Sequence, residues 1–232
     1  MRVLITCMQC FQEDGHPSDK MSYVEYNDAN VYRNICERGH DTLVVPQQQR
    51  FELLFEIAAN AILDGYYREA VASFTAAIER FFEFSFRVLA SHVAESEFTK
   101  SRKLLGLSER QLGAFVGAWV IAFAETPETL PEKKVKFRND VIHKGKFPTK
   151  QEALDYGETV FSLLKSLISK LKKHRNKELQ QVVLRDLVER SGGKQSSTVG
   201  MPTIISLVAP MPSTFSEGLA ALPGKLGRRP LV

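Results

Sequence analysis

The stretch YREAVASFTAAIERFFEFSFRVLASHVAE, residues 67–95, decides what fold we expect of this chain. Apolar side chains recur in it at the period of an α-helix, and they are Val71, Phe74, Ile78, Phe81 and Val88. Phe82, Phe84 and Phe86 fall off that stripe, so the expected helix is apolar on more than one side. Such a helix is buried on more than one side, which places it at the centre of a helical bundle or in an interface between subunits.

Segments on both sides of this helix carry apolar stripes of the same period. They are residues 48–63, 108–124, a segment that begins near Pro131, and 150–173. Asp64-Gly65 is a stop signal for the first, Ser108 is the expected N-cap of the second, and Thr149 with Glu152 resembles a capping box. We therefore expect a mainly α protein whose helical bundle spans residues 47–175.

Charge is spread unevenly along the chain. Its 232 residues are 44% apolar, enough for a core, and carry a formal net charge of +4. Residues 130–177 hold 13 Lys/Arg and 5 Asp/Glu, a charge of +8, so the rest of the chain carries −4. This asymmetry indicates an anionic partner on one face or, equally well, a solvated lysine-rich surface.

The sequence also bears on location. No apolar run has the length of a membrane span, and the N-terminus does not have the pattern of a signal peptide. We therefore expect no membrane partner and a cytoplasmic, reducing location. In such a compartment cysteines are more often thiols or metal ligands than disulfide partners.

The three cysteines of the chain lie in its first 36 residues. Cys7 and Cys10 form a Cys-x2-Cys knuckle, and Cys36 and His40 form a Cys-x3-His pair. Tetrahedral zinc takes four ligands from two such knuckles, and a module this small buries too little apolar surface to fold unaided. Residues 1–46 are therefore predicted to be a zinc ribbon with structural Zn²⁺.

Two points inside this module stay open. Met21–Tyr26 and Val31–Ile35 have the pattern of short strands around a turn at Asn27–Asn30, so they can form a hairpin between the knuckles. His16 is a rival for the fourth ligand. The alternative to a metal site is three unligated cysteines, with His40 on the surface.

The last part of the chain, residues 176–232, changes character. Leu171–Arg190 is charged and can extend the last helix, whereas Ser191–Thr198 has the composition of a flexible linker. Residues 199–232 hold five prolines and an isolated apolar stretch, Thr203–Val208. This tail is either disordered or docks on a partner, and it shows no residues suited to catalysis.

The octapeptide RNDVIHKG, residues 138–145, carries the residues best suited to chemistry. An arginine can hold a phosphate through two parallel hydrogen bonds, and a histidine can move a proton at neutral pH. Asp140 and Lys144 are expected to form an ordinary surface pair. Further lysines surround the motif, namely Lys133, Lys134, Lys136, Lys146 and Lys150. The pattern indicates chemistry on a phosphodiester.

Helical geometry limits how this motif can work. On a straight helix Arg138 and His143 point about 140° apart, whereas Asn139 and His143 share a face. A distorted last helical turn, or a site shared by two subunits, would bring the arginine and the histidine together. The alternatives without a function are an ion pair from Arg138 to Glu79 or Glu83, and His143 as a helix C-cap.

The helical part of the chain resembles HEPN domains, which are helical bundles that are often dimeric ribonucleases. One basis is RNDVIH, residues 138–143, which fits the family's signature of an arginine, a polar residue and a histidine. The other is DGYYREAV, residues 64–71, running into AIERF, residues 77–81, which looks like the second helix of members with a zinc ribbon. The resemblance leaves the N-terminal module and the tail outside.

This resemblance implies a homodimer that cleaves RNA without a metal ion and leaves a 2′,3′-cyclic phosphate. His143 would be the general base or general acid, Arg138 would stabilise the charged phosphate, and Asn139 would orient one of them. The resemblance also admits a toxin or antiviral effector held off by a regulatory protein partner. The competing expectation is a non-catalytic module that binds nucleic acid or protein.

Overall fold

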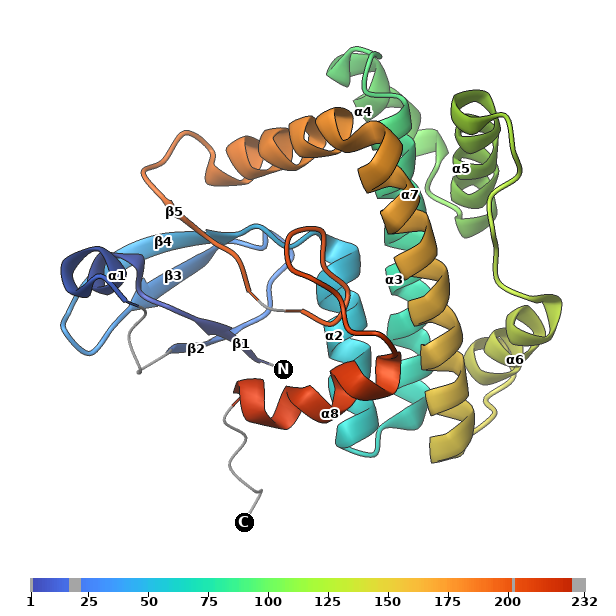
Figure 1. The fold of residues 1–232 in the computed structure, drawn as a ribbon, viewed down its shortest axis with the longest axis horizontal. Coiled ribbons are helices and arrows are strands. Elements are labelled where there is room, and N and C mark those ends of the chain that lie inside the picture. Colours follow the sequence, from blue (N-terminus) through green and yellow to red (C-terminus); the bar gives the residue numbers. More distant parts are fainter. Residues whose placement is uncertain (1, 17–21, 202, 227–232) are drawn as a thin grey trace. The chain divides into compact units, whose positions relative to one another are not determined.

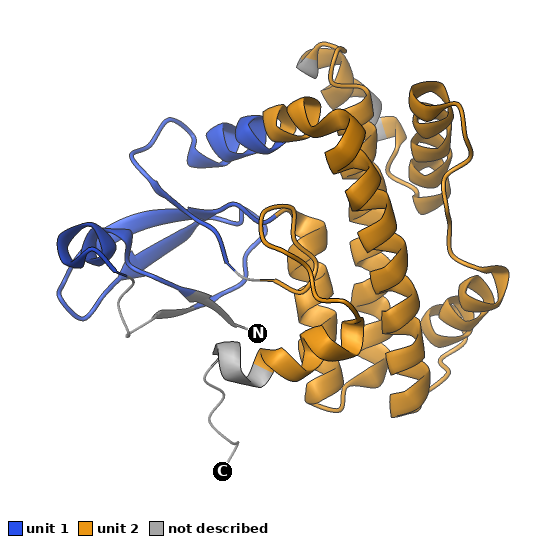
Figure 2. Cartoon of the chain, viewed as in Figure 1, with its two compact units in different colours: residues 1–48, 183–202 blue, residues 49–182, 203–232 orange. Residues whose placement is uncertain are grey.

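In a computed structural model, which describes residues 2–16, 22–201 and 203–226, the chain is mainly α with a small β element. This confirms the fold class expected from the sequence. The residues divide into two compact units, 1–48 with 183–202 and 49–182 with 203–232 (Figure 2). The first boundary falls close to the expected end of the N-terminal module at residue 46.

Among the described residues, every strand lies in the first unit (Figure 1). Strand β1 (Arg2–Ile5) pairs antiparallel with β2 (Ser22–Glu25). Strand β4 (Asp41–Pro46) is the middle of a second sheet, antiparallel to β3 (Tyr32–Ile35) and parallel to β5 (Ser197–Val199). A buried cluster of Ile5, Tyr32 and Val44 forms the centre of this unit. Partly buried apolar side chains pack against it, namely Val24, Tyr26, Val199 and Met201.

The strands expected at 21–26 and 31–35 are present as β2 and β3, although Met21 lies outside the described residues. They do not pair with each other as a hairpin. Strand β2 pairs instead with β1, which lies before Cys7, and β3 pairs with β4, which follows His40. Strands β1 and β4 are not among the predicted strands, and the predicted pairing of β2 with β3 is therefore wrong.

The second unit is built around helix α3 (Tyr67–Leu89), which follows α2 (Arg50–Leu63) after a turn with Gly65 at φ 82°. Helix α3 is shorter than the expected 67–95, because the chain leaves the helix at Ala90 and starts α4 (Glu95–Leu104). The phenylalanines of α3 are covered within the chain. The Phe81 ring lies 5.2 Å from that of Phe51, and the Phe82 ring stacks 4.6 Å from that of Phe115. Helix α3 is therefore the centre of the bundle.

Three further helices complete the region expected to be helical. Helix α5 (Ser108–Phe123) has Leu107 as its N-cap, so Ser108 is already inside the helix and the expected cap is wrong by one residue. Helix α6 (Glu132–His143) begins just after Pro131. Helix α7 (Lys150–Ser191) opens with the predicted capping box, since Glu152 N–H donates to Thr149 Oγ1 (3.2 Å) and Thr149 N–H to Glu152 Oε2 (2.8 Å). The helix continues to Ser191 across a kink at Arg175, so the charged extension is present.

The tail is not a separate region, and this corrects the expected division at residue 176. Residues 183–202 belong to the first unit, where β5 occupies part of the expected linker. Residues 203–226 belong to the second unit and include α8 (Phe215–Leu226). The Phe215 ring is fully buried, with its centre 5.6 Å from the ring of Phe55 and 5.5 Å from that of Phe74. An apolar anchor of this kind excludes disorder of the described tail.

Two buried carboxylates on α2 fix the tail on the second unit. Glu52 Oε1 accepts the Leu207 N–H at 2.8 Å, and Glu56 Oε2 accepts the Ile204 N–H at 3.0 Å. Both glutamates are nearly inaccessible to solvent. Charged side chains are rarely so buried unless they are paired or hydrogen-bonded, so these bonds explain why α2 carries acids on its inner side.

Gly157 of α7 gives a test of this packing. A methyl group on its Cα would lie 2.7 Å from the Phe215 ring and 2.9 Å from the Phe74 ring. We expect Gly157→Ala to lower the free energy of unfolding by about 1–3 kcal/mol, through overpacking. At a helical position with free space around it, the same change would raise the free energy of unfolding, because alanine is the better helix former.

Urea unfolding followed by circular dichroism measures this change. Ser166→Ala, at an exposed position of the same helix, is the matched control and should shift the unfolding free energy by less than about 0.5 kcal/mol. A Gly157→Ala protein as stable as the unsubstituted chain would show that Phe215 does not dock beside Gly157.

Candidate functional site

The first candidate site is a group of four side chains in the first unit that could hold a metal ion, Cys7, Cys10, Cys36 and His40. Their ligand atoms all lie within 4.8 Å of one another. The Cys10 sulfur lies 3.7 Å from the Cys36 sulfur and 3.3 Å from His40 Nδ1, and the Cys7 sulfur lies 3.8 Å from His40 Nδ1. The structure thus brings together the four residues singled out from the sequence, and His16 is not one of them.

The spacing of these atoms fits a tetrahedral metal site. An ion with metal–sulfur bonds of about 2.3 Å holds its sulfurs about 3.8 Å apart. The observed separation of 3.7 Å between Cys10 and Cys36 matches that value and is far longer than a disulfide bond of about 2.0 Å. Three thiols and an imidazole form a soft donor set, which suits zinc, copper(I) and iron.

Two short local structures deliver the ligands. Cys7 is the N-cap of α1 (Met8–Asp14), and Cys10 lies in the first turn of that helix. The second pair sits in a tight turn, where Gly39 N–H donates to the Cys36 carbonyl (2.9 Å) and Cys36 N–H to the His40 carbonyl (3.1 Å). Gly39 has φ 83°, a conformation that favours glycine. The glycine before the histidine is therefore part of the ligand turn.

The thiols differ in how readily they ionise. Burial, together with hydrogen bonds to Cys7 and Cys36, raises the pKa of Cys10 to about 12. At Cys36 burial also favours the thiol, but hydrogen bonds from the backbone N–H groups of His40 and Arg38, together with those from Cys10 and Cys7, lower the pKa to about 7. A cation that binds these sulfurs must release the protons that the thiols carry.

Glu13 adjoins this candidate site, although the spacing of the cysteines and histidine does not point to it. His40 turns Nδ1 toward the sulfurs and places Nε2 3.3 Å from Glu13 Oε1. Histidines that bind metals commonly give their second ring N–H to a carboxylate, which fixes the ring and raises its basicity. The available signal was a glutamate three residues after Cys10, but it points to the site only once α1 is known to be a helix.

Arg38 ties the two halves of the site together. Its guanidinium donates to both carboxylate oxygens of Asp14, at 3.0 and 2.7 Å, and lies 3.5 Å from Glu13. Arg38 thereby holds the pKa of Asp14 below its usual value. The pair is exposed, so its contribution to stability is small, but the two parallel bonds align the ligand turn with the end of α1.

The second candidate site is the segment 138–145, in the second unit. Arg138 NH1 lies 3.7 Å from Glu79 Oε1 on α3, which is the ion pair expected as the alternative to a function. Arg138 Nε is buried and has no hydrogen-bond partner among the described residues. One long ion pair therefore holds the guanidinium of Arg138, and its Nε–H donates no hydrogen bond to a described residue.

The structure does not bring Arg138 and His143 together within the chain. His143 is the last residue of α6, and its side chain is exposed. No hydrogen bond or ion pair joins it to another described residue, and the same holds for the half-buried amide of Asn139. The helix runs regularly through His143, so the arginine and the histidine keep the angular separation of a straight helix.

The lysines around this motif form a solvated surface. Lys144 Nζ lies 2.8 Å from Asp140 Oδ1, as predicted, and its hydrogen bond lowers the pKa of Asp140. Lys146 pairs with Glu152. Lys133, Lys136 and Lys150 are exposed. Lysines that face solvent in this way can meet a phosphate backbone without first breaking a buried contact.

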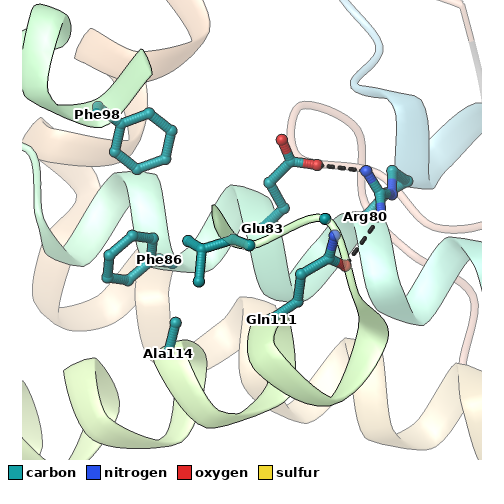
Figure 3. Close-up of a pocket in the computed structure, with 8 residues that line it drawn as sticks. Arg80, Glu83, Phe86, Phe98, Gln111 and Ala114 are labelled. Carbon is teal, nitrogen blue, oxygen red and sulfur yellow. Dashed lines mark hydrogen bonds and ion pairs between the residues drawn. The ribbon is translucent and has the colours of Figure 1, made fainter. Parts of the chain in front are cut away.

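A pocket of about 190 Å³ lies between α3, α4 and α5 in the second unit (Figure 3). Arg80 spans one wall, donating to Glu83 Oε2 (2.6 Å) and Gln111 Oε1 (2.9 Å), and the rings of Phe86 and Phe98 form the other. The pocket is smaller than most ligand sites, and Arg80 already donates hydrogen bonds to two side chains of its wall. It is therefore a weaker candidate than the other two.

Comparisons with protein-family models, curated proteins and solved structures give no significant match to this chain. In the described part of the chain, no helix combines the length and the apolar character needed to cross a membrane.

Glu13 provides a test of the candidate metal site beyond its four possible ligands. We expect Glu13→Ala to weaken metal binding by about 10–100-fold, because His40 loses the acceptor of its second N–H. Titration with Co²⁺, followed by its thiolate charge-transfer absorption, gives the affinity. Glu25→Ala, an exposed position on β2, is the control and should bind Co²⁺ as the unsubstituted chain does. Equal affinity of the two variants would remove Glu13 from the site.

Proposed function

We propose that Cys7, Cys10, Cys36 and His40 bind one zinc ion that stabilises the first unit. The donor set and the tetrahedral spacing support zinc. The buried apolar core of that unit, Ile5, Tyr32 and Val44, is small, so a metal ion would supply much of its folding free energy. With every tetrahedral position taken by a side chain, the ion has a structural role and leaves no open position for a substrate.

Elemental analysis of the purified protein tests this proposal. We expect one zinc per chain, and less than about half an equivalent in Cys36→Ser, since three ligands hold zinc far more weakly than four. His16→Ala is the control, and it should retain a full equivalent. Zinc lost from the His16 variant but retained by Cys36→Ser would assign a different ligand set.

We propose that the protein is an endoribonuclease of HEPN type. Arg138 carries this proposal, because its guanidinium has one ion pair of 3.7 Å and a buried Nε without a partner. Donors left unused in this way can turn to a phosphate that enters beside Glu79. His143, exposed at the end of α6 with lysines around it, is accessible to a bound RNA chain.

In the proposed reaction His143 moves a proton at the ribose 2′-hydroxyl or at the leaving 5′-oxygen. Arg138 stabilises the charge on the phosphate, and Asn139 orients the histidine or the phosphate. The product is a 2′,3′-cyclic phosphate. Since Arg138 and His143 diverge along α6, we propose that each active site takes its arginine and its histidine from two copies of the chain.

A second candidate function is a module that binds nucleic acid or protein without cleaving it. The ion pair between Arg138 and Glu79 favours it, because this pair gives the arginine a structural role. In that case the basic segment contacts an RNA backbone and the zinc-holding unit contributes a rigid surface. The two functions differ in one product, the cyclic phosphate.

His143→Ala separates the two functions. Loss of a general acid or base typically costs about 10²–10⁴ in rate, so we expect cleavage of a labelled RNA to fall by that factor while RNA affinity is unchanged. His92→Ala, an exposed histidine of the same unit, is the matched control and should cleave normally. Equal cleavage by both variants would exclude His143 as a catalytic residue.

The same assay has two further arms. Arg138→Lys should restore little of the activity lost in Arg138→Ala, because lysine lacks the two-pronged donor of arginine. An RNA with 2′-deoxyribose at the cleavage position should stay intact. RNA that binds the unsubstituted protein but yields no cyclic phosphate would favour the binding module.

A further inference from the structure

Phe147 exposes its ring in the turn between α6 and α7 (Figure 1). The residue is 84% exposed, whereas the next most exposed of the fifteen phenylalanines, Phe11, is 37% exposed. In the described ranges, no aromatic or cation–π contact joins the Phe147 ring to another side chain. The ring therefore has no part in the core of the second unit.

The backbone on both sides of Phe147 is anchored. Before it, the N–H groups of Lys144 and Lys146 both donate to the Asp140 carbonyl, at 3.2 and 3.0 Å, so the chain folds back on the end of α6. After it, Pro148 is buried and the capping box that opens α7 begins at the next residue. The exposed ring is therefore a fixed feature of a closed turn.

Positive charge surrounds this ring. Lys144, Lys146 and Lys150 lie within three residues of Phe147 and are all exposed. A nucleic-acid strand carries negative phosphates and flat apolar base faces side by side. Sites for single strands accordingly combine basic side chains that follow the phosphates with aromatic rings that stack on the bases. The ring and the lysines of this turn are together complementary to such a strand.

We infer that Phe147 stacks on an unpaired base of a single-stranded nucleic acid, whose phosphates lie along the neighbouring lysines. Phe147 is four residues beyond His143, so their Cα atoms are at most about 14 Å apart, a distance that a few nucleotides span. The inference rests on the proposed RNA binding at residues 138–145 and names its substrate class. Strands with unpaired bases are preferred, because in a duplex the base faces are already stacked on one another.

A single strand accounts for this ring better than a membrane or an apolar groove of a protein does. From Lys144 to Lys150 the sequence contains one large apolar side chain, Phe147. Binding to a bilayer or to an apolar groove grows with the apolar area that is buried, and one ring supplies little. One ring does match the face of one base. Every base has such a face, so this contact selects unpaired strands without reading their sequence.

Phe147→Trp turns this ring into a reporter of stacking. The single tryptophan of the chain, Trp119, is 1% exposed, so its emission should not respond to a strand at the surface. Single-stranded oligodeoxyadenylate is the probe, because it has unpaired bases and lacks the 2′-hydroxyl that cleavage requires. We expect it to quench the emission of the new indole and to leave that of the unsubstituted protein unchanged. The same strand paired with its complement should quench less.

Affinity for the same probe gives an independent measure. Phe147→Ala should lower it about 5–100-fold, the usual cost of losing one stacked base. Phe147→Tyr should keep the affinity and Phe147→Leu should not, because leucine is apolar but has no flat ring. Phe147→Ala should also leave the salt dependence of binding unchanged, whereas Lys144→Ala should reduce it. Tyr66→Ala, which removes a 63% exposed ring from outside the basic segment, is the control and should bind normally.

Three results would overturn the inference. They are an indole emission that the strand does not change, full affinity in Phe147→Ala, and an indole that responds to phosphatidylserine vesicles but not to the strand. The ribonuclease proposal fails separately. Quenching by the deoxy strand without a cyclic phosphate from RNA supports stacking and removes cleavage, whereas a cyclic phosphate with full affinity in Phe147→Ala does the reverse.

Discussion

The hydrogen bonds from the C-terminal segment to Glu52 and Glu56 are the constraint on which the helical unit depends. A carboxylate buried without partners would be very costly, so the Ile204 and Leu207 N–H groups must be in place for α2 to keep its inner face. Once they are, Phe215 closes on Phe55 and Phe74. Neither the helices nor the tail can bury their surfaces alone. This interdependence explains why residues 203–226 fold as part of the bundle.

The sequence predicts those parts of the structure that rest on a repeating pattern or on a fixed spacing. The period of apolar residues places α2, α3, α5 and the start of α7, and the two cysteine knuckles identify four ligand residues that lie together. Helices α1, α4 and α8 are not among the predicted elements, and α8 is anchored by Phe215, whose ring packs on those of Phe55 and Phe74. The apolar stretch at Thr203–Val208 could not be interpreted, because its partners are two acids on another helix.

The Arg138 motif shows the other limit of sequence reasoning. Spacing along the chain predicts that Arg138 and His143 diverge on a helix, and α6 is regular through His143. Whether the two side chains meet is decided by contacts outside α6, and within one chain Arg138 meets Glu79. Glu13 illustrates the same point at the candidate metal site, since its contact depends on which ring nitrogen of His40 faces the sulfurs. Such orientations are properties of the folded chain.

The parallel pairing of β4 with β5 has a consequence for the order in which the protein can form on a ribosome. Strand β4 ends at Pro46, but its neighbour begins only at Ser197. At about 5–20 residues per second, the ribosome needs roughly 8–30 s to synthesise the residues between them. During that interval β4 has one edge exposed, and an exposed edge can pair with another nascent chain. The cysteine knuckles have already emerged, so early metal capture would hold the incomplete sheet in shape until its last strand arrives.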